Sequence, residues 1–291
     1  MNPTADLISV IVLAHNKAPL TRLCLDSLLQ STHRPLEIVV IDNGSTDETP
    51  AILERFAASA QAANVSLHVA RNRENVGCST GRNQGIAASH GRFVLFADND
   101  VMVRTRSWAQ RMLAAFARDE ALGVIGPKLI YPFPPFLVQF AGGEVSQTGR
   151  VNFTGRGERG DDPRFNAVRF VQCYISACMM LSRDVIDQVG GFDEAFNPVQ
   201  YEDIDYCYRV KELGRRIFYL PEVEFYHFEN STSAGTPGLN YTYLTVRNGM
   251  RFKRKWQHRF SREGGPADHT MQWKDIPQHN LKDLPDLELL P

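Results

Sequence analysis

The sequence predicts an α/β fold in which helices cover both faces of a central sheet. Through the first half of the chain, runs rich in β-branched residues alternate with segments of helical periodicity, which is the pattern of a parallel sheet. The chain has 291 residues, of which 43% are hydrophobic and 22% charged, so a substantial core is available. Polar residues also follow three of the expected strands, as in α/β proteins that bind ligands at one sheet edge.

The first unit is a strand followed by a helix. Ser9 to Ala14 is the kind of β-branched run found in a buried strand. Pro19 suits the first turn of the helix that follows. The inner stripe of this helix consists of residues at three- and four-residue spacing, namely Leu20, Leu23, Cys24 and Leu28.

The next two strands enclose a second helix. Residues 38–41 form a buried strand, and residues 42–47 (Asp-Asn-Gly-Ser-Thr-Asp) have turn chemistry. Thr49 and Pro50 are typical of a cap and a first helical position, and the helix is expected to reach about residue 63. Residues 67–70 are expected to form a short third strand.

A glycine turn then returns the chain to the centre of the sheet. Residues 75–77 (Asn-Val-Gly) lead into a helix expected at 78–88, and residues 93–97 form the next buried strand. In open α/β sheets, ligands bind outside the carboxyl ends of the strands. Asn16, Asp42 and Asp98 all fall at such ends, so we expect them to converge on one rim.

The second half is less regular. We expect a helix at 108–117, an irregular stretch around the prolines at 132–135, and a mobile loop at 149–162. Residues 155–160 of this loop match the spacing of a dinucleotide fingerprint, but no strong strand precedes them and no helix is expected after them, so we reject that cofactor. The remaining elements are strands at 168–172, 179–181, 217–220 and 223–226, and helices at 183–189 and 201–213. The proline-rich tail from about residue 264 is not expected to form a core element.

The composition excludes several partners and locations. Lys and Arg total 32 against 33 Asp and Glu, so charge gives no case for nucleic acid. We expect no signal peptide, because Asp6 interrupts the start of the chain, and no stretch approaches the roughly 20 apolar residues of a membrane span. The five cysteines match no zinc or redox spacing and are expected to be small buried hydrophobes. We therefore expect a protein of the reducing cytoplasm.

The most informative motif is Asp98-Asn99-Asp100, directly after the apolar run at 93–96. Two carboxylates one residue apart at a strand end make a small site for a hard cation, and a divalent ion there would neutralise charge on a departing diphosphate. Acid pairs at this spacing are mostly solvated turns. The motif therefore gains its meaning from the motifs around it.

Taken together, these motifs resemble those of the inverting family 2 glycosyltransferases of GT-A fold, in particular the bacterial branch that includes rhamnosyltransferases. The resemblance spans roughly residues 8 to 255 and rests on Ser9-Val10-Ile11-Val12, Asn16, Ile41-Asp42-Asn43-Gly44-Ser45-Thr46-Asp47, Asn75-Val76-Gly77, Gly81-Arg82-Asn83, Asp98-Asn99-Asp100, Gly191-Phe192-Asp193, Tyr201-Glu202-Asp203-Ile204-Asp205, Pro221, His227 and Arg247-Asn248. It implies a Rossmann-like mixed sheet flanked by helices in a single domain. The catalytic domain would occupy residues 1–262, with residues 263–291 as a C-terminal tail.

The resemblance also implies where a nucleotide-sugar donor binds. Asp42 would accept the imide N–H of a uracil or thymine ring, and capping of its own turn is the alternative. Arg82 would reach toward the diphosphate or ribose, and surface exposure is the alternative. The other implied donor-binding residues are Asn16, Asp98, Asn99 and Asp100.

The implied metal is magnesium or manganese, because the donors are oxygen atoms. Asp100 would ligate it, while Asp98 would lie toward the ribose or sugar if the strand continues and the two acids alternate sides. His227 is an additional ligand by resemblance, and a purely structural histidine is equally open. The predicted metal set is Asp98, Asp100 and His227.

The catalytic base is expected at the start of the helix near residue 201. Acids in a first helical turn are favoured by the helix dipole whatever their function. Glu202 and Asp205 share a face at i, i+3, while Asp203 is turned away, so only a subset can address a cleft. In the family the base corresponds to Asp203, and Glu202 is the second choice.

The implied function is metal-dependent, inverting transfer of a sugar from a UDP- or dTDP-sugar to a hydroxyl of a glycan or lipid-linked acceptor, in bacterial polysaccharide or glycoconjugate synthesis. Two alternatives are a sugar nucleotidyltransferase, whose glycine-rich loop is missing after the first strand, and a catalytically inactive nucleotide-sugar-binding protein. The sequence does not identify the sugar, the acceptor, the choice between uridine and thymidine, or the oligomeric state.

Two further features bear on specificity and location. Family members often carry Gly-Ala-Cys where this chain has Ser176-Ala177-Cys178, and the added side chain would narrow the sugar or acceptor pocket. The basic and aromatic stretch at 247–259 would suit peripheral contact with the inner face of a membrane or a lipid diphosphate, and a solvated helix face explains it equally well.

Overall fold

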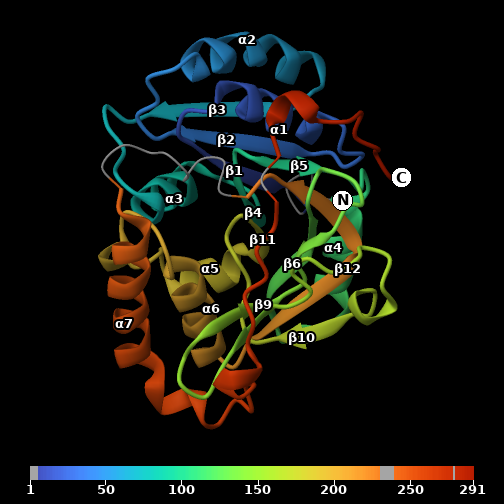
Figure 1. Ribbon diagram of the computed structural model, residues 1–291. Helices are drawn as coiled ribbons and strands as arrows, with labels where there is room; N and C mark the ends of the chain where they lie inside the picture. The colour runs from blue at the N-terminus through green and yellow to red at the C-terminus, as the bar shows by residue number, and fades with distance from the viewer. Residues whose placement is uncertain (1–5, 230–238, 278) are drawn as a thin grey trace.

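The computed structural model describes residues 6–229, 239–277 and 279–291 (Figure 1). Within these ranges the strands of the main sheet are β1 (Ile8–Ala14), β2 (Leu36–Asp42), β3 (Ser66–Arg71), β4 (Phe93–Asp98), β5 (Val101–Val103), β6 (Leu122–Ile130), β7 (Val138–Phe140), β10 (Arg169–Val171), β11 (Cys178–Ser182) and β12 (Arg216–His227). A separate small sheet is formed by β8 (Gly143–Val145) and β9 (Val151–Phe153). The helices are α1 (Ala18–Leu29), α2 (Thr49–Ala62), α3 (Cys78–Ala88), α4 (Trp108–Arg118), α5 (Arg183–Val189), α6 (Glu202–Glu212) and α7 (Tyr241–Phe260).

The first half of the sheet is parallel, as the alternating pattern predicts. The strands β3, β2, β1 and β4 lie side by side in that order. Both β1 and β2 are buried along their whole length, which is why their apolar runs show no alternation. At the carboxyl edge, Ala14 pairs with Asp42 and Leu13 pairs with Asp98. The predicted convergence of Asp42 and Asp98 on one rim is therefore confirmed.

Most helix bounds agree with the sequence to within a residue or two, and one cap does not. Thr49 was expected to cap α2, but it is the first helical residue and Glu48 occupies the cap position. In the inner stripe of α1, Leu20, Cys24 and Leu28 are buried, whereas Leu23 is only partly buried.

The sheet becomes mixed in its second half, where the sequence was hardest to interpret. Strand β11 runs antiparallel to β4 and β6, and β12 runs parallel to β6. The buried strand β6 was not expected, because Gly123, Gly126, Pro127 and Lys128 interrupt its apolar run. Two short strands were expected where β12 is continuous, and its register shifts between Leu220 and Glu224, around Pro221.

The segment at 149–162 was expected to be a mobile loop, and this prediction is wrong in part. It contains β9, which pairs with β8, and Arg156, which is buried. The glycine run at 155–160 forms turns and is followed by the three-residue 3-10 helix Pro163–Phe165. The run thus follows a three-residue antiparallel strand and is followed by no α-helix, so it lacks the parallel strand and the helix that a dinucleotide fingerprint requires.

The second half of the chain also supplies a helical layer and a strap. Figure 1 shows α5, α6 and α7 gathered on one side of the molecule, and the red C-terminal segment crossing the front from the end of α7 past β9. The described part of this segment contains only short 3-10 turns, as its prolines predict, yet Leu290 pairs with the backbone of Arg104 and Arg106. Within the described ranges, no helix is both long and apolar enough to span a bilayer.

Candidate active site

A cavity of about 600 Å³ opens at the carboxyl edge of the parallel strands. His15 lies just after β1, Asn43 just after β2, and the 98–100 motif at the end of β4. From the second half of the chain come the first residues of α6 and the last residue of β12. The acidic, basic and histidine side chains in its wall are His15, Arg82, Asp98, Asp100, Glu202, Asp203, His227 and Glu229. Segments far apart in the sequence thus place their acidic and basic groups around one space.

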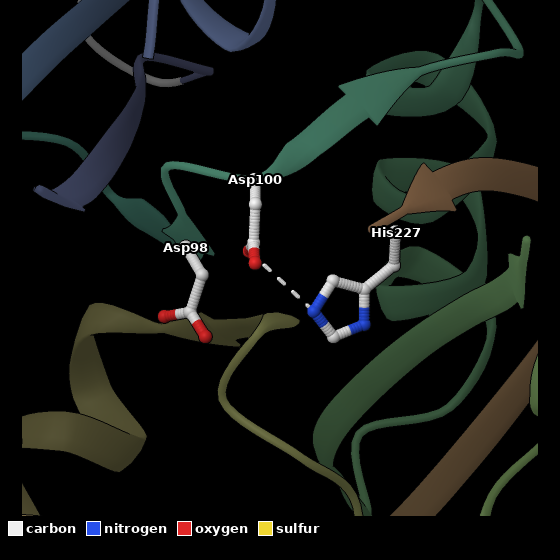
Figure 2. A group of neighbouring side chains, drawn as sticks. All are labelled: Asp98, Asp100 and His227. Carbon is white, nitrogen blue, oxygen red and sulfur yellow. Dashed lines mark ion pairs between the residues drawn. The ribbon is translucent and has the colours of Figure 1, made fainter. Parts of the chain in front are cut away.

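Asp98, Asp100 and His227 form a compact group in this cavity (Figure 2). One ligand atom from each residue lies within 4.8 Å of the others. The expectation that the two acids alternate sides of a continuing strand is wrong, because β4 ends at Asp98 and the chain turns at Asn99 and Asp100 before β5 begins. This turn directs both carboxylates into the cavity.

The group has the features of a cation site. Oδ1 of Asp100 is buried and has no hydrogen-bond partner, and Nε2 of His227 lies 3.5 Å from it, which is long for a hydrogen bond. An unsatisfied buried carboxylate oxygen is costly unless a ligand fills the space. Two carboxylates and an imidazole are a donor set that manganese accepts.

His227 is oriented by a residue that the sequence did not suggest. Its Nδ1 lies 3.1 Å from Oε1 of Gln139, so an N–H at Nδ1 leaves the Nε2 lone pair facing Asp100. Burial lowers the pKa of His227, but the charge and close contact of Asp100, together with the charges of Asp98 and Glu229, outweigh burial and raise this pKa above its usual range. Gln139 lies on the short strand β7, after the proline-rich stretch, where no motif singles it out.

Arg82 lies between the two acidic groups of the cavity. Its guanidinium donates to Oδ1 of Asp98 at 2.6 Å and to Oε1 of Glu202 at 3.1 Å. The side chain is 3% exposed, so the alternative of a surface arginine is wrong. A buried arginine shared by two carboxylates holds both in fixed positions. Arg82 thereby links the group of Asp98, Asp100 and His227 to the start of α6.

Glu202 and Asp203 both line the cavity at the start of α6. Oδ1 of Asp203 accepts the N–H of Ile204 at 2.8 Å, and Oδ2 accepts the N–H of Ser176 at 3.2 Å. Burial raises the pKa of Asp203 and, helped by the charge of Asp203, raises the pKa of Glu202 as well. Ser176, where family members often carry glycine, is buried and lines the same cavity.

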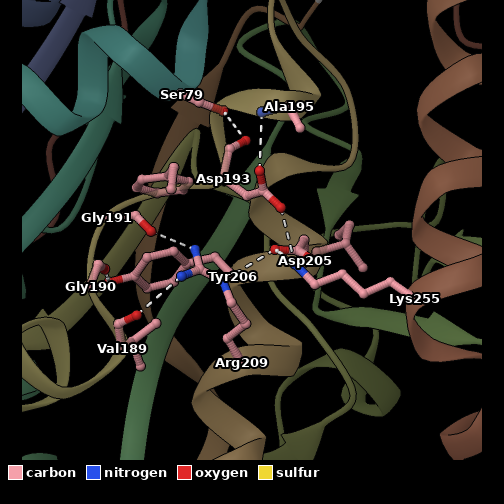
Figure 3. A network of polar contacts seen from close by, with 12 residues as sticks. Ser79, Val189, Gly190, Gly191, Asp193, Ala195, Asp205, Tyr206, Arg209 and Lys255 are labelled. Carbon is pink, nitrogen blue, oxygen red and sulfur yellow. Dashed lines mark hydrogen bonds and ion pairs between the residues drawn. The ribbon is translucent and has the colours of Figure 1, made fainter.

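Asp205 has a different environment, shown in Figure 3. It is fully buried and accepts from Lys255, Arg209 and the indole N–H of Trp256. Lys255 also binds Asp193, 3.1 Å away. The expected pairing of Glu202 with Asp205 on one face is therefore wrong, since Glu202 and Asp203 reach the cavity while Asp205 joins α6 to α7.

The loop before α6 has a strained backbone. Gln200 and Tyr201 have φ of 86° and 71°, a region that non-glycine residues rarely occupy. Asn248, fully buried on α7, donates its amide to the carbonyl oxygens of Phe196, Val199 and Gln200 at 2.6, 2.8 and 3.0 Å. These bonds hold the loop from which Glu202 and Asp203 begin.

Asn16 and Asp42 lie at the expected rim, but their side chains are engaged in the fold. Oδ1 of Asn16 accepts the N–H of Thr46 at 2.8 Å. Asp42 is fully buried, accepts the N–H of Ser45 at 2.9 Å and lies 3.2 Å from Nε of Arg71. The turn-capping alternative for Asp42 is thus observed. Neither residue is among those that line the cavity.

Asn99, which was also predicted to bind the donor, does line the cavity. Its amide donates to Oγ1 of Thr21 at 2.8 Å and to the carbonyl oxygen of Asn16 at 2.9 Å. These bonds tie the turn of the 98–100 motif to α1.

Comparisons with known proteins agree with this geometry. The sequence model described as Glycosyl transferase family 2 matches residues 9–190. The chain is 29% identical to the O-antigen biosynthesis protein RfbC of Myxococcus xanthus over 232 residues, which are 77% of this chain and 17% of that protein. The chain spans less than half the length of the first curated relatives that it matches.

Two solved structures share the fold. The structure of GalNAc-T7 with UDP, GalNAc and Mn²⁺ matches with a TM-score of 0.69 and 18% identity, over 87% of this chain and 49% of that one. The mannosyltransferase PcManGT from Pyrobaculum calidifontis, in complex with GDP-Man and Mn²⁺, matches with a TM-score of 0.58 and 19% identity, over 90% of this chain and 66% of that one. The architecture is therefore the GT-A fold.

Proposed function

The chain belongs to glycosyl transferase family 2, and from this premise we propose that it transfers a sugar from a nucleoside diphosphate sugar to a hydroxyl acceptor with inversion at the anomeric carbon. The observation that carries the proposal is the placement of Asp98, Asp100 and His227 in one cavity with Asp203. A cation-binding group and a candidate base facing one space are what such a transfer needs.

We assign the metal to Asp98, Asp100 and His227. The unsatisfied oxygen of Asp100 and the orientation of His227 by Gln139 support this assignment. A bound manganese or magnesium ion would neutralise charge on the diphosphate leaving group. Arg82 is ion-paired with Asp98 and holds its carboxylate in place. We therefore assign Arg82 a positioning role, in addition to the predicted contact with the donor.

Asp203 is the proposed base. The acceptor oxygen would form a bond to the anomeric carbon as its proton passes to Asp203, and the bond from that carbon to the diphosphate oxygen would break with its electron pair leaving on the nucleotide. The two backbone N–H groups of Ile204 and Ser176 orient this carboxylate. Glu202 is the second candidate, because its Oε1 is ion-paired with the cationic Arg82, whereas the oxygens of Asp203 accept neutral backbone N–H groups.

The donor is proposed to carry uridine or thymidine. Asp42 would bind the base through Oδ2, which lacks a hydrogen bond other than its ion pair with Arg71. This requires Arg71, which is largely exposed, to move aside. Asn16 would act by shaping the loop beside the base, and Asn99, tied to Thr21, by fixing the turn between the two acids.

The acceptor is proposed to be a glycan or a lipid-linked sugar at a membrane surface. Helix α7 contains no acidic residue, and its outer face exposes Tyr243, Val246 and Met250 beside Arg251 and Arg254. Apolar and basic groups on one face suit an anionic bilayer. Leu239, which precedes this helix, and Tyr241 and Thr245, near its start, line the cavity, so a lipid-linked acceptor bound there would lie beside the bilayer.

The extent of the catalytic unit also belongs to the proposal. We assign it residues 1–262, with the tail at 263–291 packed against it. RfbC acts in O-antigen biosynthesis by its name, which supports a role in polysaccharide or glycoconjugate synthesis.

A thermal-shift screen tests the proposal. UDP-, dTDP- and GDP-sugars are compared with and without manganese, because a ligand that binds only the folded protein raises its melting temperature. We expect one donor to stabilise the protein only when manganese is present. Release of pyrophosphate from a sugar phosphate and a nucleoside triphosphate would instead indicate a nucleotidyltransferase, and donor binding without transfer or hydrolysis would indicate an inactive binding protein.

A further inference from the structure

The wall of the cavity contains an exposed tryptophan from the C-terminal tail. Trp273 is 55% exposed and lines the same space as the metal group, whereas Trp108 and Trp256 are 0% and 5% exposed. A large aromatic ring left open to a cavity on a segment without helix or strand is unusual for a residue that only packs.

The ring of Trp273 packs against Arg156 and Phe153. The guanidinium of Arg156 lies 4.1 Å from the centre of its ring, and the ring of Phe153 lies 5.2 Å away at 60°. Arg156 is buried, and its Nε donates to the backbone carbonyl of Lys274 at 2.9 Å. The tail is thus fixed at this point, and the indole is presented in a defined position.

The charge of Arg156 is not available to a ligand. Its Nη1 contacts both carboxylate oxygens of Glu229 at 2.6 and 2.8 Å, and Glu229 also accepts from Tyr131. Because Arg156 is buried and its charge is paired with that of Glu229, it is a poor partner for a phosphate or a carboxylate on a ligand.

Besides Trp273, the cavity has several neutral side chains, and its Glu229 is paired with Arg156. The neutral residues include Phe153, which contacts Trp273, and Val151 on the same strand, β9, together with Tyr201 before α6 and Thr245 on α7. An aromatic face with a few hydroxyl groups suits a ligand that has an apolar face and polar edges. A pyranose ring has this character, because its axial C–H bonds form an apolar face while its hydroxyl groups point outward.

We propose that Trp273 is the stacking platform of the acceptor subsite and that it takes a neutral pyranose ring. This inference rests on the proposed function, since it makes that ring the acceptor of the transfer. It places acceptor recognition on the tail at 263–291, outside the segment at 9–190 that the family model matches.

The test labels the protein with 5-fluorotryptophan, so that its three tryptophans give separate fluorine resonances. Trp273→Phe assigns the resonance of interest, and the buried Trp108 and Trp256 serve as internal references. The probes are the methyl glycosides of glucose, galactose, mannose and rhamnose, with methyl glucuronide as the anionic counterpart, each up to about 100 mM in the presence of UDP and manganese.

We expect at least one neutral glycoside to shift the Trp273 resonance saturably while both reference resonances stay unchanged. Trp273→Ala should weaken binding of that glycoside about tenfold or more, Trp273→Phe about threefold or less, and Phe170→Ala, which removes an exposed ring outside the cavity, not at all. A resonance that no neutral glycoside moves, or that methyl glucuronide moves equally, overturns the inference.

The same samples separate this inference from the proposed function. Manganese-dependent binding of UDP, followed by calorimetry, reports the donor site and does not require Trp273. If UDP binds and the Trp273 resonance stays fixed, only the acceptor platform is wrong. If no nucleotide diphosphate among UDP, dTDP and GDP binds with manganese, the proposed function itself is wrong.

Discussion

Replacing Asn248 tests how the fold positions the proposed base. Asn248→Ala removes an amide that donates to three backbone carbonyl oxygens of residues 196–200. Two N–H groups are shared among these acceptors, and each net hydrogen bond contributes about 1 kcal/mol, so we expect the free energy of unfolding to fall by about 1–3 kcal/mol. For a chain of this size that is a fall of a few degrees in melting temperature.

The effect on transfer should exceed the effect on stability. Without Asn248, the left-handed conformations of Gln200 and Tyr201 can relax, since each costs about 1–3 kcal/mol to maintain. Relaxation would displace Glu202 and Asp203, and a displacement of about 1 Å at a reacting group can lower the rate about 100-fold. We therefore expect kcat of Asn248→Ala to be at least about tenfold lower than that of the wild type. The rates are compared at 15 °C, where the variant stays folded.

The matched control is Asn240→Ala on the same helix. Asn240 accepts the N–H of Tyr243 and caps α7, and removing such a cap costs about 1 kcal/mol without touching the loop at 196–201. Initial rates of donor consumption and thermal unfolding are measured for both variants. Equal losses of kcat in the two variants would refute the idea that Asn248 holds the base in place.

Four other predictions concern the proposed base, the shared arginine and α7. Asp203→Asn should keep manganese-dependent donor binding and lose transfer by about 100-fold or more. Because burial raises the pKa of this carboxylate, the wild-type kcat/KM should rise with pH through a pKa above the usual value of about 3.9. A rise in kcat/KM centred at about 3.9 would contradict this. Because the raised pKa belongs to the folded state, ionisation of Asp203 opposes folding, so Asp203→Asn should unfold at an equal or higher temperature at pH 8 and lose this advantage below pH 4; calorimetric scans at both pH values decide it. Arg82→Met should leave Asp98 and Glu202 unpaired and weaken donor binding and transfer together, whereas a fall in kcat alone would assign Arg82 to the transition state only. Arg251→Glu with Arg254→Glu should abolish sedimentation with vesicles containing anionic lipid and spare binding of UDP, and a concentration-dependent dimer disrupted by the same pair would assign this face to a second copy instead.

The parallel half of the fold was predictable because its local signals agree with one another. In β1 and β2 the apolar runs are uninterrupted, and the turns after them carry glycine and asparagine, so pattern and turn chemistry give the same answer. The second half was harder. In β6, two glycines, a proline and a lysine fall within a strand that is buried on both sides, and only tertiary contacts, such as the pairing of Lys128 with Glu224, make that sequence acceptable.

The candidate site shows the same division. Asp98, Asp100, Glu202 and Asp203 belong to recognisable motifs, but their directions depend on where a strand ends and a helix begins. Because of the turn at residues 99–100 and the strained residues before Glu202, the acids that face the cavity differ from those expected from an uninterrupted strand and from helical spacing. These details follow from packing between distant segments.

Other parts of the site carry no sequence signal of their own. Gln139 and Trp273 lie on short or irregular segments that reach the cavity through long-range packing. Conversely, Lys255 belonged to a basic stretch that suggested a surface, and the fold uses it to bind Asp193 and Asp205. No periodicity or motif in a single sequence reports such contacts.

The most direct test of the account is calorimetric titration of UDP, dTDP and GDP into the protein with manganese or with a chelator. The group formed by Asp98, Asp100 and His227 predicts that one nucleotide binds with manganese, that chelation lowers its affinity at least about tenfold, and that Asp100→Asn lowers it equally while unfolding at a similar temperature. Equal affinity in the presence and absence of manganese, or unchanged affinity in Asp100→Asn, would contradict the account.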